Sequence, residues 1–266
     1  MYDDFYKSQL SSQARQYYEL ILRRCRMGDV KCSFELPVRP SYRKVSIGES
    51  FEAIKAIRED HPEFFWIGNE YSATLRGKKL TLDCKAIYTA EQIRRIKKLL
   101  ERYLVAIVAG TDGMSVLVKE RMIYERIAMI DYKNNNEVHD HNVVSALLKG
   151  TSVCEGYTSL LILALRRVGI PAIKVSGYAN EKHCWAIAWI NGTPVHLDVT
   201  WDNVKNGRPR YRYFNLTDDE ITRDHRIDTI GVPKCTNSNY SGRLMKKGVL
   251  NKLEHAFPRF ASALVV

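Results

Sequence analysis

Three residues that are far apart in the chain, Cys154, His183 and Asp198, have side chains that could together perform thiol chemistry. A cysteine thiolate attacks carbonyl carbon atoms, a histidine imidazole takes up and returns the proton, and a carboxylate orients the imidazole. Whether the chain can do this chemistry depends on whether the elements that carry these residues bring them together.

Cys154 lies at the start of an apolar segment whose two ends are marked by the sequence. Ser152 and Glu155 have the spacing of a capping box, which predicts Ser152 as the N-cap and places Cys154 in the first helical turn. Gly169 and Pro171 predict the end of that helix. The positive end of a helix favours a thiolate. The alternative is a packing role, because free cysteines are among the most buried residues.

His183 and Asp198 flank a strong hairpin signal. Asn191-Gly192 between two alternating apolar runs predicts a two-residue type I′ turn, with Ile190 facing Thr193. Because strand side chains alternate, this register places His183 and Asp198 on one face as diagonal neighbours, about 7–8 Å apart at Cβ or less. The turn alone therefore predicts a histidine–carboxylate pair, and a slip of one residue would separate the two side chains.

The motifs around these residues resemble the transglutaminase-like superfamily, in its bacterial protease-like branch. The resemblance spans about residues 50 to 225 and is most specific from 141 to 202. The motifs are DHPEFFW (60–66), HNVVSALLKG (141–150), SVCEGY (152–157), HCWAIAWINGTPVHLDVTWD (183–202) and YFNLTDDEITRDH (213–225).

This resemblance implies a papain-like core, in which a central helix carries the cysteine and adjacent antiparallel strands carry the histidine and the acid. By position it implies Cys154 as nucleophile, His183 as general base and Asp198 as orienting acid. Family members usually read H-A-W-N where this chain has His183-Cys184-Trp185-Ala186. We expect Cys184 to point away from His183 and to be a small core residue.

The remaining pattern predicts an α+β fold. Helices are expected at about 11–26, 49–62, 89–110 and 115–135, with a hairpin at 71–88, and the buried helix and the strands follow. We expect three parts, which are an N-terminal helical region with a small hairpin (1–112), a transglutaminase-like catalytic core (113–230) and an unassigned C-terminal extension (231–266).

Composition excludes several classes of protein. The 266-residue chain has a net charge of +11, but its basic clusters are short and dispersed, so a nucleic-acid partner is not expected. No apolar run reaches the length of a membrane span, and no secretion signal is visible. We therefore expect a cytoplasmic protein, or an extracellular one if a leader was removed. The six cysteines form no C-x-x-C pair, which argues against structural zinc and favours reduced thiols.

These observations predict a thiol-dependent hydrolase or acyl transferase that acts on peptide or carboxamide bonds through a thioester. A protease or amidase is favoured over protein cross-linking, with a peptide or protein substrate, for which cell-wall peptide is one candidate. No cofactor or metal is expected, and the sequence does not indicate the oligomeric state. The alternative is a catalytically silent binding module of the same fold, which would present a groove to a peptide or a glycan.

Overall fold

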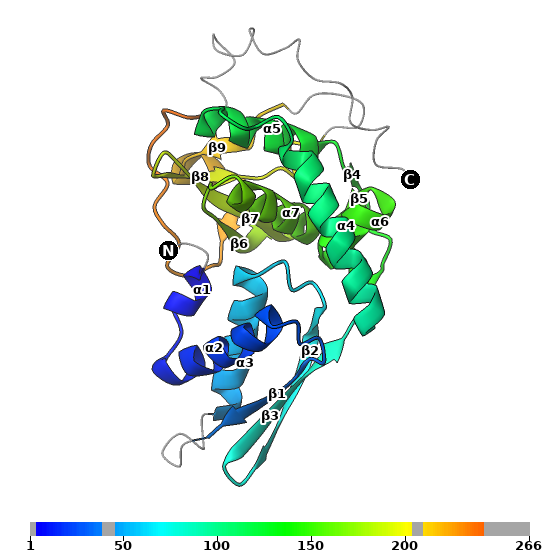
Figure 1. The fold of residues 1–266 in the computed structure, drawn as a ribbon. Helices are drawn as coiled ribbons and strands as arrows, with labels where there is room; N and C mark the ends of the chain where they lie inside the picture. Colours follow the sequence, from blue (N-terminus) through cyan, green and yellow to red (C-terminus); the bar gives the residue numbers. More distant parts are fainter. Residues whose placement is uncertain (1–3, 39–45, 204–209, 242–266) are drawn as a thin grey trace.

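The computed structural model describes residues 4–38, 46–203 and 210–241, shown in Figure 1. The expected extension at 231–266 therefore lies outside the described residues from 242 onward. Within the described part, no helix combines the length and the apolar character that crossing a membrane requires.

The N-terminal elements pack two longer helices on a small sheet. The elements are α1 (Phe5–Ser8), α2 (Ser12–Arg26), β1 (Ser33–Pro37), α3 (Ser46–Asp60), β2 (Ile67–Arg76) and β3 (Lys79–Ala86). The three strands are antiparallel, in the order β1-β3-β2. The hairpin turn at Gly77 adopts a positive φ of 60°, in agreement with the turn expected there.

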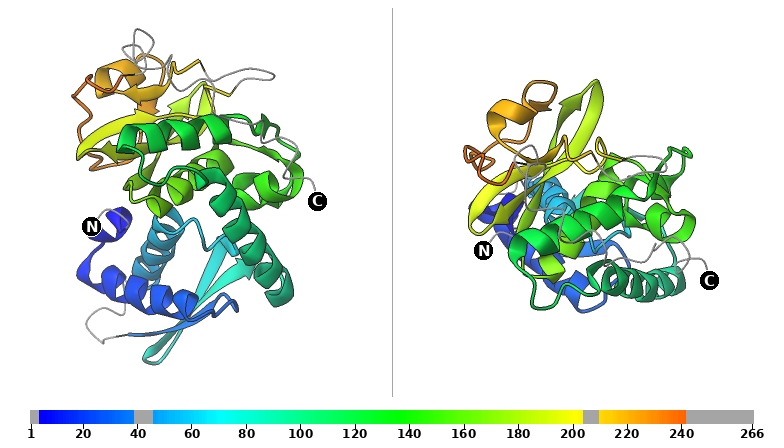
Figure 2. Two further views of the ribbon diagram at one scale, coloured as in Figure 1. Left: turned by 45° about the horizontal axis from the view of Figure 1, so that its top comes forward. Right: turned by 90° about the horizontal axis from the view of Figure 1, so that it is seen from above.

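A group of helices leads from this part to the central helix. It comprises α4 (Ala90–Val108), α5 (Val116–Ala128), η2 (Val138–His141), α6 (Val143–Lys149) and α7 (Cys154–Arg167). The short strands β4 (Asp131–Tyr132) and β5 (Thr151–Ser152) pair in parallel. Thr89 and Gln92 form a capping box at the start of α4. Figures 1 and 2 show α4 beside α5 and α7, and its contacts are to these helices and α6.

The second sheet carries the histidine of interest. Its strands are β6 (Ala172–Ala179), β7 (Glu181–Ile190), β8 (Thr193–Leu197), β9 (Phe214–Leu216) and β10 (Arg226–Ile227), with the short helix α8 (Asp218–Ile221) before β10. Neighbouring strands are antiparallel, in the order β10-β6-β7-β8-β9. Helix α7 packs on β6 and β7. The expected α+β architecture, a papain-like core in which the cysteine helix packs on an antiparallel sheet, is confirmed.

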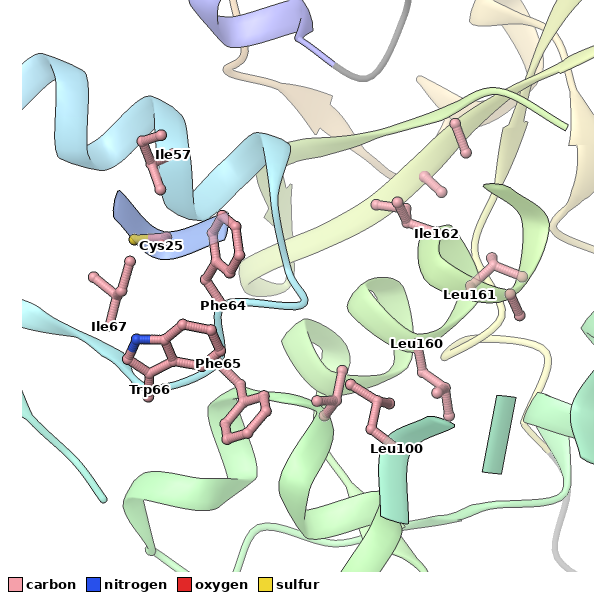
Figure 3. Packing of buried hydrophobic residues seen from close by; sticks show 14 of the residues in the cluster. Cys25, Ile57, Phe64, Phe65, Trp66, Ile67, Leu100, Leu160, Leu161 and Ile162 are labelled. Atoms are coloured by element: carbon pink, nitrogen blue, oxygen red, sulfur yellow. The ribbon is translucent and has the colours of Figure 1, made fainter. Parts of the chain in front are cut away.

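One apolar cluster joins the N-terminal elements to this core. It includes Ile57 of α3, Phe64 and Phe65 from the segment after α3, and Leu100 and Leu160 of the helices that follow, all less than a tenth exposed (Figure 3). The N-terminal elements and the core therefore pack against each other through buried apolar side chains, which fixes the N-terminal elements against the helix that begins at Cys154.

Candidate active site

The hairpin that carries His183 has the register that its turn predicts. Ile190 faces Thr193, and the turn residues Asn191 and Gly192 have φ values of 50° and 81°. Positive φ at both central residues is the requirement of a type I′ turn. The β7–β8 ladder continues to the pair of Ala186 with Leu197, so that Asp198 directly follows the last paired residue.

His183 and Asp198 meet as predicted. His183 Nε2 lies 2.8 Å from Asp198 Oδ2, and the Asp198 side chain is fully buried. Asp198 Oδ1 accepts the backbone N–H groups of Thr200 at 3.0 Å and Trp201 at 3.2 Å. Burial alone would raise the pKa of Asp198, but the hydrogen bonds from His183 and a second histidine keep that pKa below its ordinary value. The acid is thus held ionised and oriented.

Cys154 is the first residue of α7, but the expected capping box is wrong. The N-cap is Val153, and no side chain caps the helix. Ser152 belongs to β5, where it pairs with Tyr132, and its hydroxyl donates to the carbonyl of Val153 at 3.3 Å. Strand pairing therefore takes Ser152 out of the capping position. Glu155 forms an ion pair with His141 instead of reaching back.

The side chains of Cys184 and His183 both act on the thiol of Cys154. The bond with Cys184 is the larger cause, and with the bond to His183 it lowers the pKa of Cys154 to about 5 against the effect of burial. Burial opposes the protonation of His183, yet its bonds to Asp198 and Cys154 raise its pKa to about 10. Because Nε2 faces Asp198, Nδ1 is the His183 nitrogen left for Cys154. Both shifts favour a thiolate on Cys154 and an imidazolium on His183 at neutral pH.

The expectation that Cys184 is only a small core residue is incomplete. The side chain is buried and lies on the face of β7 that packs on α7, opposite to His183. However, its sulfur lies 3.7 Å from Thr158 Oγ1, one helical turn after Cys154, and its thiol hydrogen-bonds with Cys154. This bond, together with burial, raises the pKa of Cys184 well above its ordinary value. The two shifts favour a protonated thiol on Cys184 and a thiolate on Cys154.

Aromatic rings enclose the histidine. The rings of Trp185 and Trp201 both lie 6.1 Å from that of His183, centroid to centroid. Trp185 Nε1 donates to His196 Nδ1 at 3.0 Å, and His196 Nε2 lies 3.0 Å from Asp218 Oδ1. His196 is fully buried, so it is part of the scaffold and not of an exposed rim. These rings exclude water from one side of the His183–Asp198 pair.

His225 is a residue of the site that sequence reasoning missed. Its Nε2 lies 3.0 Å from Asp198 Oδ2, and its Nδ1 lies 2.6 Å from Asp224 Oδ1. The motif YFNLTDDEITRDH contains this histidine, but no turn signal fixes where the segment lies. The position of His225 depends on β9 pairing with β8 and on β10 pairing with β6.

Within residues 4–38, 46–203 and 210–241, two groups of side chains have the composition of a metal site. They are His183 with Asp198 and His225, and His196 with Asp218 and Cys235; within each group the potential ligand atoms lie within 4.8 Å of one another. In both groups the imidazole nitrogens and carboxylate oxygens already contact each other as hydrogen-bonded pairs. The histidines of the HDH sequence at 139–141 diverge, because His139 contacts Tyr88 at 2.7 Å and His141 contacts Glu155.

A cleft of about 470 Å³ lies between the N-terminal elements and the core. Phe64 and Asn69 line it on one side, and Glu155, Ser159 and Lys174 on the other. Two of these residues belong to the first turns of α7, although Cys154 itself does not line the cleft. The size is that of an ordinary ligand pocket, about 300–1,000 Å³.

Comparison with known proteins gives a match to a family model and several similar structures, of which two are described. Residues 105–201 match the model of the transglutaminase-like superfamily. A crystal structure of a TGase is similar at 15% identity and a TM-score of 0.38, over 54% of this chain and 47% of the TGase, so this chain spans about half of its length. A structure described as "a putative cysteine protease from Cytophaga hutchinsonii" is similar at 14% identity and a TM-score of 0.34, over 64% of this chain and 80% of that one.

No curated protein matches the sequence significantly. The matched segment of the family model includes Cys154, His183 and Asp198. Residues 105–201 of this chain are therefore similar to the transglutaminase-like superfamily.

Proposed function

We propose that this protein is a thiol-dependent hydrolase or acyl transferase in which Cys154, His183 and Asp198 act as nucleophile, general acid–base and orienting carboxylate. The observation that carries the proposal is the 2.8 Å contact between His183 Nε2 and the buried Asp198, together with a thiol at the start of α7 whose pKa His183 helps to lower. The similarity of residues 105–201 to the transglutaminase-like superfamily supports it, and the catalytic part is proposed to be 113–230.

The first half of the reaction forms a thioester. The Cys154 thiolate attacks the carbonyl carbon of a peptide or carboxamide bond, and negative charge develops on the carbonyl oxygen. Backbone N–H groups at the start of a helix have no intrahelical partner, and the N–H of Cys154 is the donor that we assign to this oxygen. His183 then transfers its proton from Nδ1 to the leaving nitrogen, while Asp198 holds Nε2.

The second half transfers the acyl group to water or to an amine. Neutral His183 takes a proton from the attacking group, and the thioester breaks to regenerate the Cys154 thiolate. The resemblance of the motifs to the bacterial protease-like branch supports water over an amine, and a peptide or protein as substrate. We therefore favour proteolysis or deamidation over cross-linking.

The test presents a labelled peptide library to the protein with and without a primary amine, and compares wild type with Cys154→Ala. We expect cleavage or ammonia release, together with a covalent acyl adduct on Cys154 that mass spectrometry detects. Incorporation of the amine would identify a transferase. If wild type and Cys154→Ala behave alike and no adduct forms, the enzymatic proposal is wrong and the groove-presenting binding module is the better account.

A further inference from the structure

His225 is a buried histidine to which the proposed reaction gives no role, yet it contacts the carboxylate that orients His183. The residue lies between α8 and β10 and is 3% exposed. Its ring centroid is 4.6 Å from that of Trp201, 5.1 Å from Trp185 and 5.6 Å from His183. These neighbouring rings hold the His225 imidazole with its Nε2 toward Asp198.

The two oxygens of Asp198 have different partners. Oδ1 accepts two backbone N–H groups, from Thr200 and Trp201. Oδ2 receives both imidazoles, from His183 at 2.8 Å and from His225 at 3.0 Å. The buried carboxylate of Asp198 therefore contacts four hydrogen-bond donors. Two of them are imidazoles, and both lie on the same oxygen, Oδ2.

The second nitrogen of His225 also lies against a carboxylate. Nδ1 is 2.6 Å from Asp224 Oδ1, and Asp224 Oδ2 accepts the hydroxyl of Tyr213 at 2.7 Å. The Asp224 side chain is 41% exposed. A neutral imidazole has a single N–H, whereas an imidazolium has two. Only the imidazolium lets His225 donate to Asp224 and Asp198 at once.

We propose that His225 is a positioning residue which, as an imidazolium held between Asp224 and Asp198, keeps Asp198 ionised throughout the reaction. The inference rests on the proposed function. When His183 gives its proton to the leaving nitrogen, Asp198 loses the cation on its Oδ2 while it stays buried. A buried carboxylate without a cationic partner is strongly destabilised. The charge of His225 remains, so the proton has no reason to move to Asp198.

The same charge acts on His183 directly. Two imidazolium groups on one oxygen repel each other, so His225 makes His183 a stronger acid and a better proton donor to the leaving group. The titratable groups that face His225 are Asp198 after β8, Asp224 after α8, His183 on β7 and Tyr213 before β9; His196 on β8 also senses its charge.

The first test measures the alkylation rate of Cys154 by iodoacetamide against pH, which needs no substrate. In wild type the rate should change at low pH, when the thiolate forms, and again at high pH, when His183 loses its proton. His225→Gln keeps a donor of similar reach but removes the charge. We expect the upper inflection to move to higher pH by about one unit or more, as for unit charges that are about 5–6 Å apart.

The second test observes the histidine ring nitrogens by NMR in the 15N-labelled protein. We expect both nitrogens of His225 to carry protons at neutral pH, and we expect Asp224→Asn to remove the proton on Nδ1, because its carboxylate acceptor is gone. Asp219→Asn is the matched control, because Asp219 is an exposed acid of α8 with the same charge change. It should leave His225 unaltered.

The outcomes separate this inference from the proposed function. If wild-type Cys154 alkylates like an ordinary thiol, the proposed function fails. If wild type shows both inflections, but folded His225→Gln shows the same upper one, only the role of His225 fails. A singly protonated His225 at neutral pH would also overturn the proposed role of His225, whether or not the His225→Gln variant folds.

Discussion

Single residues around Cys154 show how the chain makes a reactive thiol. The imidazole of His183 and the thiol of Cys184 both lower the pKa of the Cys154 thiol. Cys184 stands where the resembling proteins usually have alanine, and its contact with Thr158 holds it beside the first turns of α7. The proposed nucleophile of this chain therefore has a neighbouring thiol that alanine could not supply.

Replacing Cys184 should make Cys154 less acidic. In Cys184→Ala the thiolate loses one donor, and we expect the pKa of Cys154 to rise from about 5 by about one unit, as for the loss of a hydrogen bond to a charged group. Cys184→Ser keeps a donor and should recover most of the shift. The measurement is the lower inflection of the alkylation rate against pH. An unchanged inflection in Cys184→Ala would show that the sulfur of Cys184 does not stabilise the thiolate.

Secondary-structure elements decide which parts of the site the sequence could predict. The register of β7 and β8 follows from Asn191-Gly192, because the turn is local, and so the contact between His183 and Asp198 was predictable. The cap at the start of α7 was not predictable, because Ser152 belongs to β5 and pairs with a strand that lies about twenty residues earlier. His225 depends on strand pairings that no short motif encodes.

The close packing at the start of α7 gives a prediction at this scale. A Cβ on Gly156 would lie 1.9 Å from Ser152 Oγ and 2.7 Å from the carbonyl of Asn142. Gly156→Ala should therefore push the first turn of α7 away from β5 and α6. We expect the free energy of unfolding to fall by about 1–3 kcal/mol and the pKa of Cys154 to rise. Urea unfolding and the alkylation profile measure the two effects.

Gly48→Ala is the matched control for that change. Gly48 lies in α3, and a Cβ there would meet nothing within 4 Å. Alanine should stabilise the helix by about 0.5–1 kcal/mol and leave the alkylation of Cys154 unchanged. A normal alkylation profile in Gly156→Ala would contradict the view that the first turn of α7 positions the sulfur.

At the scale of the whole molecule, the buried acid Glu120 links the stability of the protein to pH. Glu120 of α5 is fully buried, and Asn215 of β9 donates to its Oε2 at 3.1 Å. Burial raises the pKa of Glu120 to about 8 from an ordinary value of 4.5. The folded protein therefore keeps the proton at pH values where the unfolded chain releases it.

The stabilisation from the neutral acid is complete below about pH 4.5 and is lost as the pH rises through about 8. Glu120→Gln stays neutral at every pH, so its stability should fall less between these limits, by a difference on the order of a few kcal/mol. Urea unfolding of both proteins across this range measures the difference. Parallel pH profiles would show that Glu120 is ionised in the folded state.

The central claim is that Cys154 and His183 form a thiolate–imidazolium pair, and the alkylation of wild-type Cys154 against pH tests it most directly. Mass spectrometry locates the adduct, and the urea-unfolded chain gives the reference for a free thiol. The structure predicts half-maximal reactivity near pH 5 and a second change near pH 10. A single inflection near 9, the same as in the unfolded chain, would contradict the pair and the reaction built on it.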